Sequence, residues 1–161
     1  MKIQRNILLN PGPATTTDSV KRALVVPDIC PRETEFGELM MQVGRDLVDI
    51  VHGGRAYEAI LFAGSGTCAV EACISSVVAP AGKIAIINNG AYGARMVAMA
   101  KAHALPHLEI ALPWGQRPDP TRVATLLRKD RRITCLAMVH HETTTGQLNP
   151  LQAMGRVARS A

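Results

Sequence analysis

Apolar residues recur at steps of three and four positions between Phe36 and Val51. This is the spacing of one face of an α-helix, so the pattern predicts an amphipathic helix there, with Gly53-Gly54 as its stop signal. Nearer the amino terminus, Pro11-Gly12-Pro13 and a run of threonines punctuate the backbone. We therefore expect residues 1–17 to form a loop segment and the first helix to begin no earlier than Asp18.

After residue 56, short apolar runs alternate with longer helical patterns. The runs predict strands at 57–62, 83–88, 107–112 and 133–139. Helices are expected at 67–78, at 91–104, from Asp119-Pro120 and from Pro150. Alternating strands and helices are typical of an α/β fold with a mainly parallel sheet and helices on both faces. Ligands bind such sheets beyond the carboxyl ends of the strands, so the loops after 62, 88 and 139 are the candidates for a site.

Composition and charge narrow the function classes. The chain has 161 residues, which fits about one domain, with 47% hydrophobic, 19% charged and 3% aromatic residues. So few aromatic rings, and a net charge of +5 spread without a basic run, argue against nucleic acid as a partner. No apolar stretch approaches the roughly 18–20 residues of a membrane span. No secretory leader is recognisable either, so we expect no membrane partner and a cytoplasmic protein.

Cysteine spacing favours neither a metal site nor a disulfide framework. Cys30, Cys68, Cys73 and Cys135 form no C-x-x-C pair, so reduced, mostly buried thiols are expected. His141-Glu142 invites a metal reading, but neighbouring residues at a strand end point to opposite sides and no third ligand is spaced for a site. We expect no metal.

The first candidate loop is Gly64-Ser65-Gly66-Thr67, between an apolar run and a helix. Glycine backbone, two hydroxyls and the free amides of a helix start suit a phosphate, although a tight turn without a ligand fits equally well. Gly64, Gly66 and Ala69 also match a loose dinucleotide fingerprint. A dinucleotide site needs an acidic residue about 20 positions further along the chain to bind the ribose, but Asn88-Asn89 occupies that position.

The other two loops offer one ring and a row of hydroxyls. Tyr92 lies between two glycines at a helix start, where its ring could cover a planar cofactor or simply pack on the next helix. The sequence from His140 to Gly146 follows the most apolar run of the chain. Its hydroxyls and imidazoles suit a polar, oriented ligand.

With these loops together, the chain resembles the class V, fold-type-I aminotransferases, which use pyridoxal 5'-phosphate. The resemblance lies in five stretches that occur in the family's order: 8–13, 26–33, 64–72, 89–95 and 141–150. It implies that Ser65, Gly66 and Thr67 bind the cofactor phosphate, that Tyr92 stacks on the pyridine ring and that Thr143 bonds near the ring oxygen. Pro11 and Gly12 would line the substrate entrance.

The resemblance is greatest to family members that act in phosphonate catabolism. They move the amino group of 2-aminoethylphosphonate to pyruvate, giving phosphonoacetaldehyde and L-alanine. The resemblance also implies that the complete protein is a homodimer and that residues 18–161 form part of the large, cofactor-binding domain.

The chain departs from the family in what it lacks. The Schiff-base lysine and the aspartate that pairs with the pyridinium nitrogen follow a later strand in the family, so no catalytic residue is expected here. The lysines present lie elsewhere: Lys2, Lys21, Lys83, Lys101 and Lys129. We therefore interpret the sequence as a truncated amino-terminal portion without the small domain, inactive by itself and poorly soluble or oligomeric. A dinucleotide-binding module and a non-catalytic remnant remain the alternatives.

Overall fold

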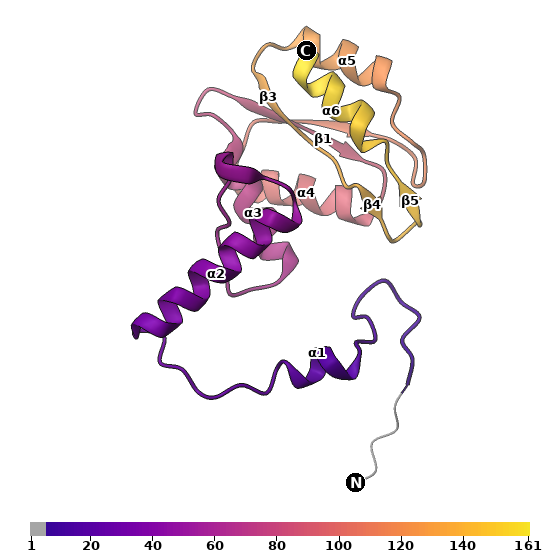
Figure 1. The fold of residues 1–161 in the computed structure, drawn as a ribbon. Helices are drawn as coiled ribbons and strands as arrows, with labels where there is room; N and C mark the ends of the chain where they lie inside the picture. Colours follow the sequence, from indigo (N-terminus) through magenta and orange to yellow (C-terminus); the bar gives the residue numbers. More distant parts are fainter. Residues whose placement is uncertain (1–5) are drawn as a thin grey trace. The chain divides into compact units, whose positions relative to one another are not determined.

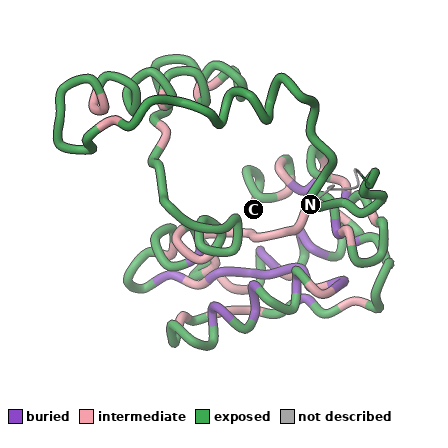
Figure 2. Tube along the Cα trace, turned by 90° about the horizontal axis from the view of Figure 1, so that it is seen from below, coloured by how far each residue is buried: buried purple, intermediate pink, exposed green. Residues whose placement is uncertain are grey.

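The computed structural model describes residues 6–161, which form two compact units that meet at the Ala63–Gly64 bond (Figure 1). The first unit contains α1 (Asp18–Arg22), α2 (Thr34–Ile50) and a short 3₁₀ helix (Gly54–Ala56). The expected amphipathic helix is confirmed as α2, and among residues 6–161 no helix begins before Asp18. Residues 1–5 of the expected loop lie outside the described residues. None of these helices buries a residue, as the exposed trace in Figure 2 also shows. The apolar face of α2 is therefore present but uncovered.

The strand expected at 57–62 is wrong. This segment is extended at Tyr57 but forms no strand, and its large apolar side chains are exposed. A strand is defined by backbone hydrogen bonds to a neighbour, and none of the described strands pairs with 57–62. Apolar composition alone therefore gave a false signal here.

The second unit is built on a three-stranded parallel sheet in the order β2-β1-β3. Its strands are β1 (Lys83–Asn88), β2 (His107–Ala111) and β3 (Ile133–Ala137). The helices are α3 (Gly66–Val77), α4 (Ala91–Ala102), α5 (Pro120–Lys129) and α6 (Leu151–Ser160). Each element lies where the pattern predicts it, within a few residues at the ends.

The central strand β1 divides the core into two halves. Ile84 and Ile86 pack with α3 and α4 on one face, whereas Ala85 and Ile87 pack with α5 and α6 on the other. All four are fully buried, which explains why β1 reads as a continuous apolar run rather than an alternating one. The sheet is thus covered on both faces, as the α/β pattern predicts.

Helix starts follow local chemistry. The Asp119 side chain accepts a hydrogen bond from the Thr121 amide at 2.9 Å, and Pro120 occupies the first position of α5. This is the cap that the sequence indicates. A two-residue hairpin pair, β4 (His141–Glu142) and β5 (Gln147–Leu148), was not expected, because strands this short carry no periodicity.

Candidate active site

The amino terminus of α3 is open. Ser65 adopts extended backbone angles as its cap, and its Oγ accepts a hydrogen bond from the Cys68 amide at 3.4 Å. A methyl group added at Gly66 would meet nothing within 4 Å, so the backbone is unobstructed on that side of the first turn. The free amides and the positive end of the helix dipole make such a terminus suited to an anion.

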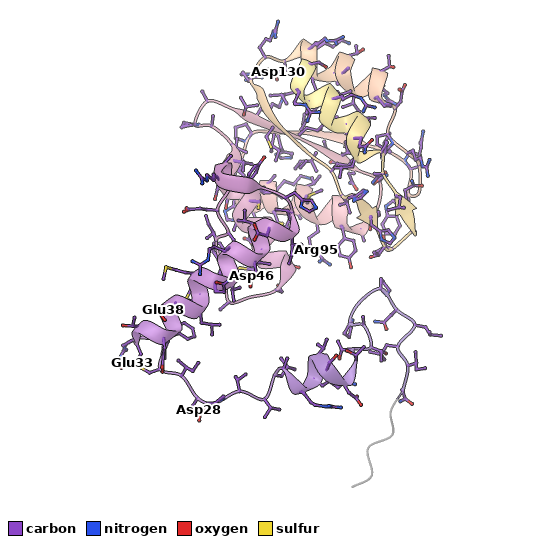
Figure 3. The ribbon with its side chains drawn as sticks, viewed as in Figure 1. Asp28, Glu33, Glu38, Asp46, Arg95 and Asp130 are labelled. Atoms are coloured by element: carbon purple, nitrogen blue, oxygen red, sulfur yellow. The ribbon has the colours of Figure 1, made fainter. Side chains whose placement is uncertain are left out.

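Arg95 connects the α3 terminus to the predicted aromatic ring. Its Nη1 donates to Thr67 Oγ1 at 3.3 Å, and its guanidinium carbon lies 4.9 Å from the centre of the Tyr92 ring. Figure 3 shows Arg95 extending from α4. The structure thus brings Thr67 and Tyr92 to one place. Among the residues that the structure describes, Arg95 forms no ion pair with a carboxylate.

Sequence reasoning assigned no role to Arg95. The available signal was its spacing: residues three apart lie on the same side of a helix, so Arg95 and Tyr92 are neighbours on α4. The contact with Thr67, which is 28 positions away, carries no such signal.

Glu142 lies beneath the α4 terminus, where protein donors occupy both of its carboxylate oxygens. It is fully buried, and its Oε2 accepts hydrogen bonds from the amides of Tyr92 at 3.0 Å and Gly93 at 3.2 Å. Thr144 donates its hydroxyl to Oε1 at 2.6 Å. The described residues contain no group of three or more His, Cys, Asp or Glu side chains arranged to hold a metal ion.

The side chain of Asn89 is committed to an internal network. Its Nδ2 donates to Asn149 Oδ1 and to the Gln116 carbonyl, both at 2.8 Å. Asn149 Nδ2 in turn donates to the Val139 carbonyl at 2.7 Å. This buried amide pair ties the segments that follow β1 and β3, so the two loops that carry Tyr92 and Thr143 start from a common support.

The remaining predicted residues are less constrained. Thr143 is half-buried, and its neighbours Glu142 and Thr144 are held by the bonds described above. Pro11 and Gly12 are exposed and belong to the first unit, and their role at a substrate entrance stays a prediction. Lys83 lies at the amino end of β1, where its Nζ is 3.2 Å from Asp130 Oδ2.

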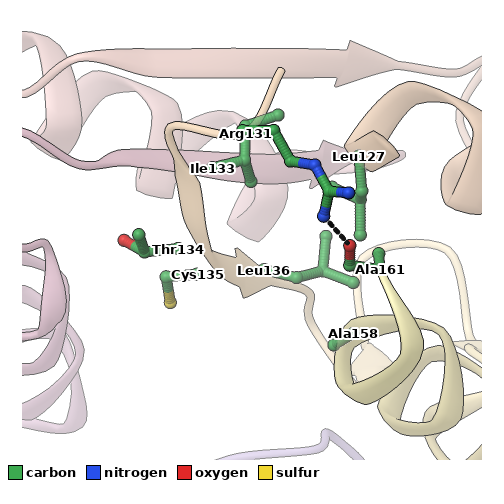
Figure 4. A pocket seen from close by; sticks show the side chains of 8 residues that line it. All are labelled: Leu127, Arg131, Ile133, Thr134, Cys135, Leu136, Ala158 and Ala161. Carbon is green, nitrogen blue, oxygen red and sulfur yellow. Dashed lines mark hydrogen bonds between the residues drawn. The ribbon is translucent and has the colours of Figure 1, made fainter. Parts of the chain in front are cut away.

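A separate small pocket lies at the start of β3. Its volume is about 130 Å³, and Figure 4 shows Arg131 donating to the Ala161 carbonyl beside it at 3.3 Å. Burial raises the pKa of the Cys135 thiol on its wall. The other three cysteines are exposed, so the expectation of mostly buried thiols is wrong. Tyr92 and Glu142 follow the carboxyl ends of β1 and β3, so this pocket is not part of the candidate site. Among the described helices, none is long and apolar enough to cross a membrane.

Known proteins share both the sequence and the fold. The family model for class V aminotransferases matches residues 22–161. The 2-aminoethylphosphonate–pyruvate transaminase of Klebsiella pneumoniae is 38% identical over 160 residues, which is 99% of this chain and 43% of that protein. The namesake from Syntrophobacter fumaroxidans is 38% identical over 154 residues.

Two solved structures superpose on nearly the whole chain. Pyridoxamine–pyruvate aminotransferase from Mesorhizobium loti covers 96% of it at 25% identity, with a TM-score of 0.86. Alanine–glyoxylate aminotransferase from Nostoc sp. covers 99% of it at 31% identity, with a TM-score of 0.85. The match spans 39% and 42% of those chains.

The sheet, its two helical layers and the open α3 terminus are therefore part of a PLP-transferase fold. The chain belongs to the class V aminotransferase family. It spans less than half the length of the relatives that it matches.

Proposed function

We propose that this chain forms the part of a pyridoxal 5'-phosphate transaminase that binds the cofactor phosphate and ring. The enzyme would move the amino group of 2-aminoethylphosphonate to pyruvate and release phosphonoacetaldehyde and L-alanine. The observation that carries the proposal is the Arg95 contact, which joins the phosphate loop at Thr67 to the ring residue Tyr92. The names of the 38% identical relatives support the substrate pair.

The residues present fit the phosphate end of this cofactor. The α3 terminus offers free amides and the hydroxyls of Ser65 and Thr67. Because the Ser65 oxygen accepts from the Cys68 amide, its hydroxyl hydrogen remains available to a ligand. Arg95 adds a positive charge at the same terminus. Two neighbouring positive features without a carboxylate partner are stabilised by a dianion between them.

The ring end has a different chemistry. Tyr92 presents an aromatic face, and Thr143 offers a hydroxyl for a ring oxygen. When bound, the cofactor supplies an electron sink for chemistry at the carbon that bears the amino group. The residues of this chain hold and orient the cofactor; we assign no proton transfer to any of them.

The dinucleotide alternative has less support. It requires an acidic side chain facing the ligand at the end of β1, where Asn89 is buried against Asn149.

We further propose that the complete protein is a cytoplasmic homodimer in which residues 18–161 form part of the cofactor domain.

Ligand binding tests the proposal directly. Pyridoxamine 5'-phosphate is the suitable probe, because it lacks the aldehyde that labels surface lysines. In equilibrium dialysis, it should bind the chain more tightly than pyridoxamine or inorganic phosphate does. Thr67→Val should weaken it about tenfold, as expected for a lost bond to a charged group of about 1.5 kcal/mol. The matched control is Thr125→Val on α5, where the exposed hydroxyl donates to the Thr121 carbonyl within its own helix.

Two outcomes would refute the proposal. Equal affinity for pyridoxamine with and without its phosphate would remove the phosphate site. Tighter binding of NADH than of pyridoxamine 5'-phosphate would favour the dinucleotide module. For the reaction itself, residues 1–161 can replace the matching segment of the Klebsiella relative, and alanine formation from 2-aminoethylphosphonate and pyruvate can be measured.

A further inference from the structure

One buried carboxylate has no part in the proposed cofactor contacts. Glu142 is fully buried, and both of its oxygens are occupied by protein donors. A buried charge is unfavourable unless it is well hydrogen-bonded, so its surroundings must be built to hold it. They are: Oε2 accepts from two amides in the first turn of α4, where the helix dipole favours a negative charge.

The backbone leaves room for this side chain at Gly90. A methyl group added there would overlap the Glu142 Cγ and Cδ atoms. The φ angle of Gly90 is 176°, which any residue adopts, so the glycine is required for space and not for its conformation. The absence of a side chain at Gly90 therefore makes room for the side chain of Glu142, 52 positions later in the sequence.

The second oxygen holds the loop that contains Thr143. Thr144 donates its hydroxyl to Glu142 Oε1 at 2.6 Å and accepts from the Ala91 amide at 3.4 Å. The Glu142 carbonyl also accepts from the Thr145 amide at 3.1 Å. Thr143 thus lies between two residues that are fixed to the α4 terminus.

One carboxylate consequently bonds to the Tyr92 amide through one oxygen and to the Thr143 loop through the other. We propose that Glu142 is a positioning residue, which fixes Tyr92 and Thr143 relative to each other and so preorganises the ring-binding half of the site. It touches neither cofactor nor substrate. This inference rests on the proposed function, because the benefit of the arrangement is cofactor binding.

Four variants separate positioning from charge and from stability. Glu142→Ala removes the hydrogen bonds to the α4 amides and the bond to the Thr144 hydroxyl. Glu142→Gln keeps them, since an amide oxygen can accept from the α4 amides while its nitrogen donates to the Thr144 hydroxyl. Gly90→Ala displaces the intact carboxylate. Thr144→Val removes the bond between the loop and Glu142 Oε1 and leaves the bonds to the α4 amides in place. Glu71→Gln is the matched control, because Glu71 bonds to His103 at the surface.

Three quantities are measured on the full chain. They are the dissociation constant of pyridoxamine 5'-phosphate, that of inorganic phosphate, and the hydrogen-exchange rates of the Tyr92 and Gly93 amides. In Glu142→Ala and Gly90→Ala, cofactor binding should weaken at least about tenfold. Both amides should exchange faster, while phosphate affinity stays unchanged. Thr144→Val should weaken cofactor binding without changing amide exchange, and Glu142→Gln should stay within about threefold.

The inference is overturned if Glu142→Ala binds pyridoxamine 5'-phosphate within about twofold of the parent chain. Equal losses in Glu142→Ala and Glu142→Gln would also overturn it, since charge and not geometry would then be the cause. Should Glu142→Ala fail to fold, Gly90→Ala and Thr144→Val decide, because both retain the carboxylate. Absence of cofactor binding by the parent chain refutes the proposed function instead, and unchanged amide exchange in Glu142→Ala would then reject the contact itself.

Discussion

The amide pair beneath the site provides a direct test of its internal support. Asn89→Ala removes the donor to the Gln116 carbonyl and to Asn149 Oδ1, each now bonded at 2.8 Å. Asn89 and Asn149 are almost completely buried, so water cannot easily replace the lost donor. Gln116 is exposed, so water can bond to its carbonyl, whereas the buried Asn149 Oδ1 would lose its partner. A buried acceptor left without a partner costs about 1–3 kcal/mol, and this is the loss that we expect.

Urea unfolding followed by far-UV circular dichroism measures this loss as a lower midpoint at unchanged slope. Asn88→Ala is the matched control, since Asn88 Nδ2 bonds to the exposed Glu109 carboxylate at 2.7 Å. It should lose less than about 1 kcal/mol. If the free energy of unfolding of Asn89→Ala is within about 0.5 kcal/mol of that of the parent chain, the network contributes no net stability and the reasoning fails.

Substitution by aspartate gives the same test a pH axis. Asn89→Asp places a carboxyl group where an amide now donates to two acceptors. Burial beside those oxygens disfavours ionisation, so the folded-state pKa of this group would lie above its unfolded value. Such a group contributes stability that is lost as pH rises. The variant should therefore be less stable at pH 7 than at pH 4 relative to the parent, and the opposite order would contradict the assigned donor directions.

Three further predictions concern single residues of the second unit. Gly93→Ala should destabilise the chain by about 1–3 kcal/mol, because its methyl group would lie 2.9 Å from the Asn88 Cα. Gly155→Ala in α6 should instead be neutral or stabilising in the same urea titration, because its methyl group would meet only the end of the Arg159 side chain at 3.6 Å. Hydrogen bonds from Arg132, and then from Lys83, lower the pKa of Asp130. The stability that these bonds contribute is therefore present above the unfolded pKa and lost as pH falls, so the difference between the parent chain and Asp130→Asn should shrink in acid melts. Arg95→Ala should weaken pyridoxamine 5'-phosphate binding more than pyridoxamine binding in dialysis, and equal losses would place the guanidinium away from the phosphate.

Helices and strands with a clear hydrophobic pattern could be predicted from the sequence. Segments whose structure depends on pairing with a distant strand could not. The run 83–88 became β1 and the cap at Asp119 started α5, because both signals lie within a few neighbouring residues. The run 57–62 has the same apolar character as β1 but lacks a paired neighbour, so it forms no strand. The hairpin of β4 and β5 was missed for the opposite reason: its strands are defined by pairing and contain too few residues to show a pattern.

The candidate site shows the same division. Its residue types were readable from the loops, but the bonds that arrange them span 28, 50 and 60 positions. The sequence alone does not distinguish the polar residues of a loop that contact a ligand from those that support the loop. In the structure, the side chains of Asn89 and Glu142 bond to protein atoms instead.

Burial distinguishes the polar residues that support this site from those that can bind. Asn89, Glu142 and Asn149 are buried, and each satisfies its hydrogen bonds within the protein. The Thr67 hydroxyl and the Arg95 guanidinium are exposed and have donors to spare, because a threonine hydroxyl that accepts one bond can still donate. A ligand gains most from groups that are already held in position, since little conformational entropy is lost when they bind. The buried amides and carboxylate therefore hold the loops, and the exposed Thr67 hydroxyl and Arg95 guanidinium are the groups to which we assign anion recognition in the proposed site.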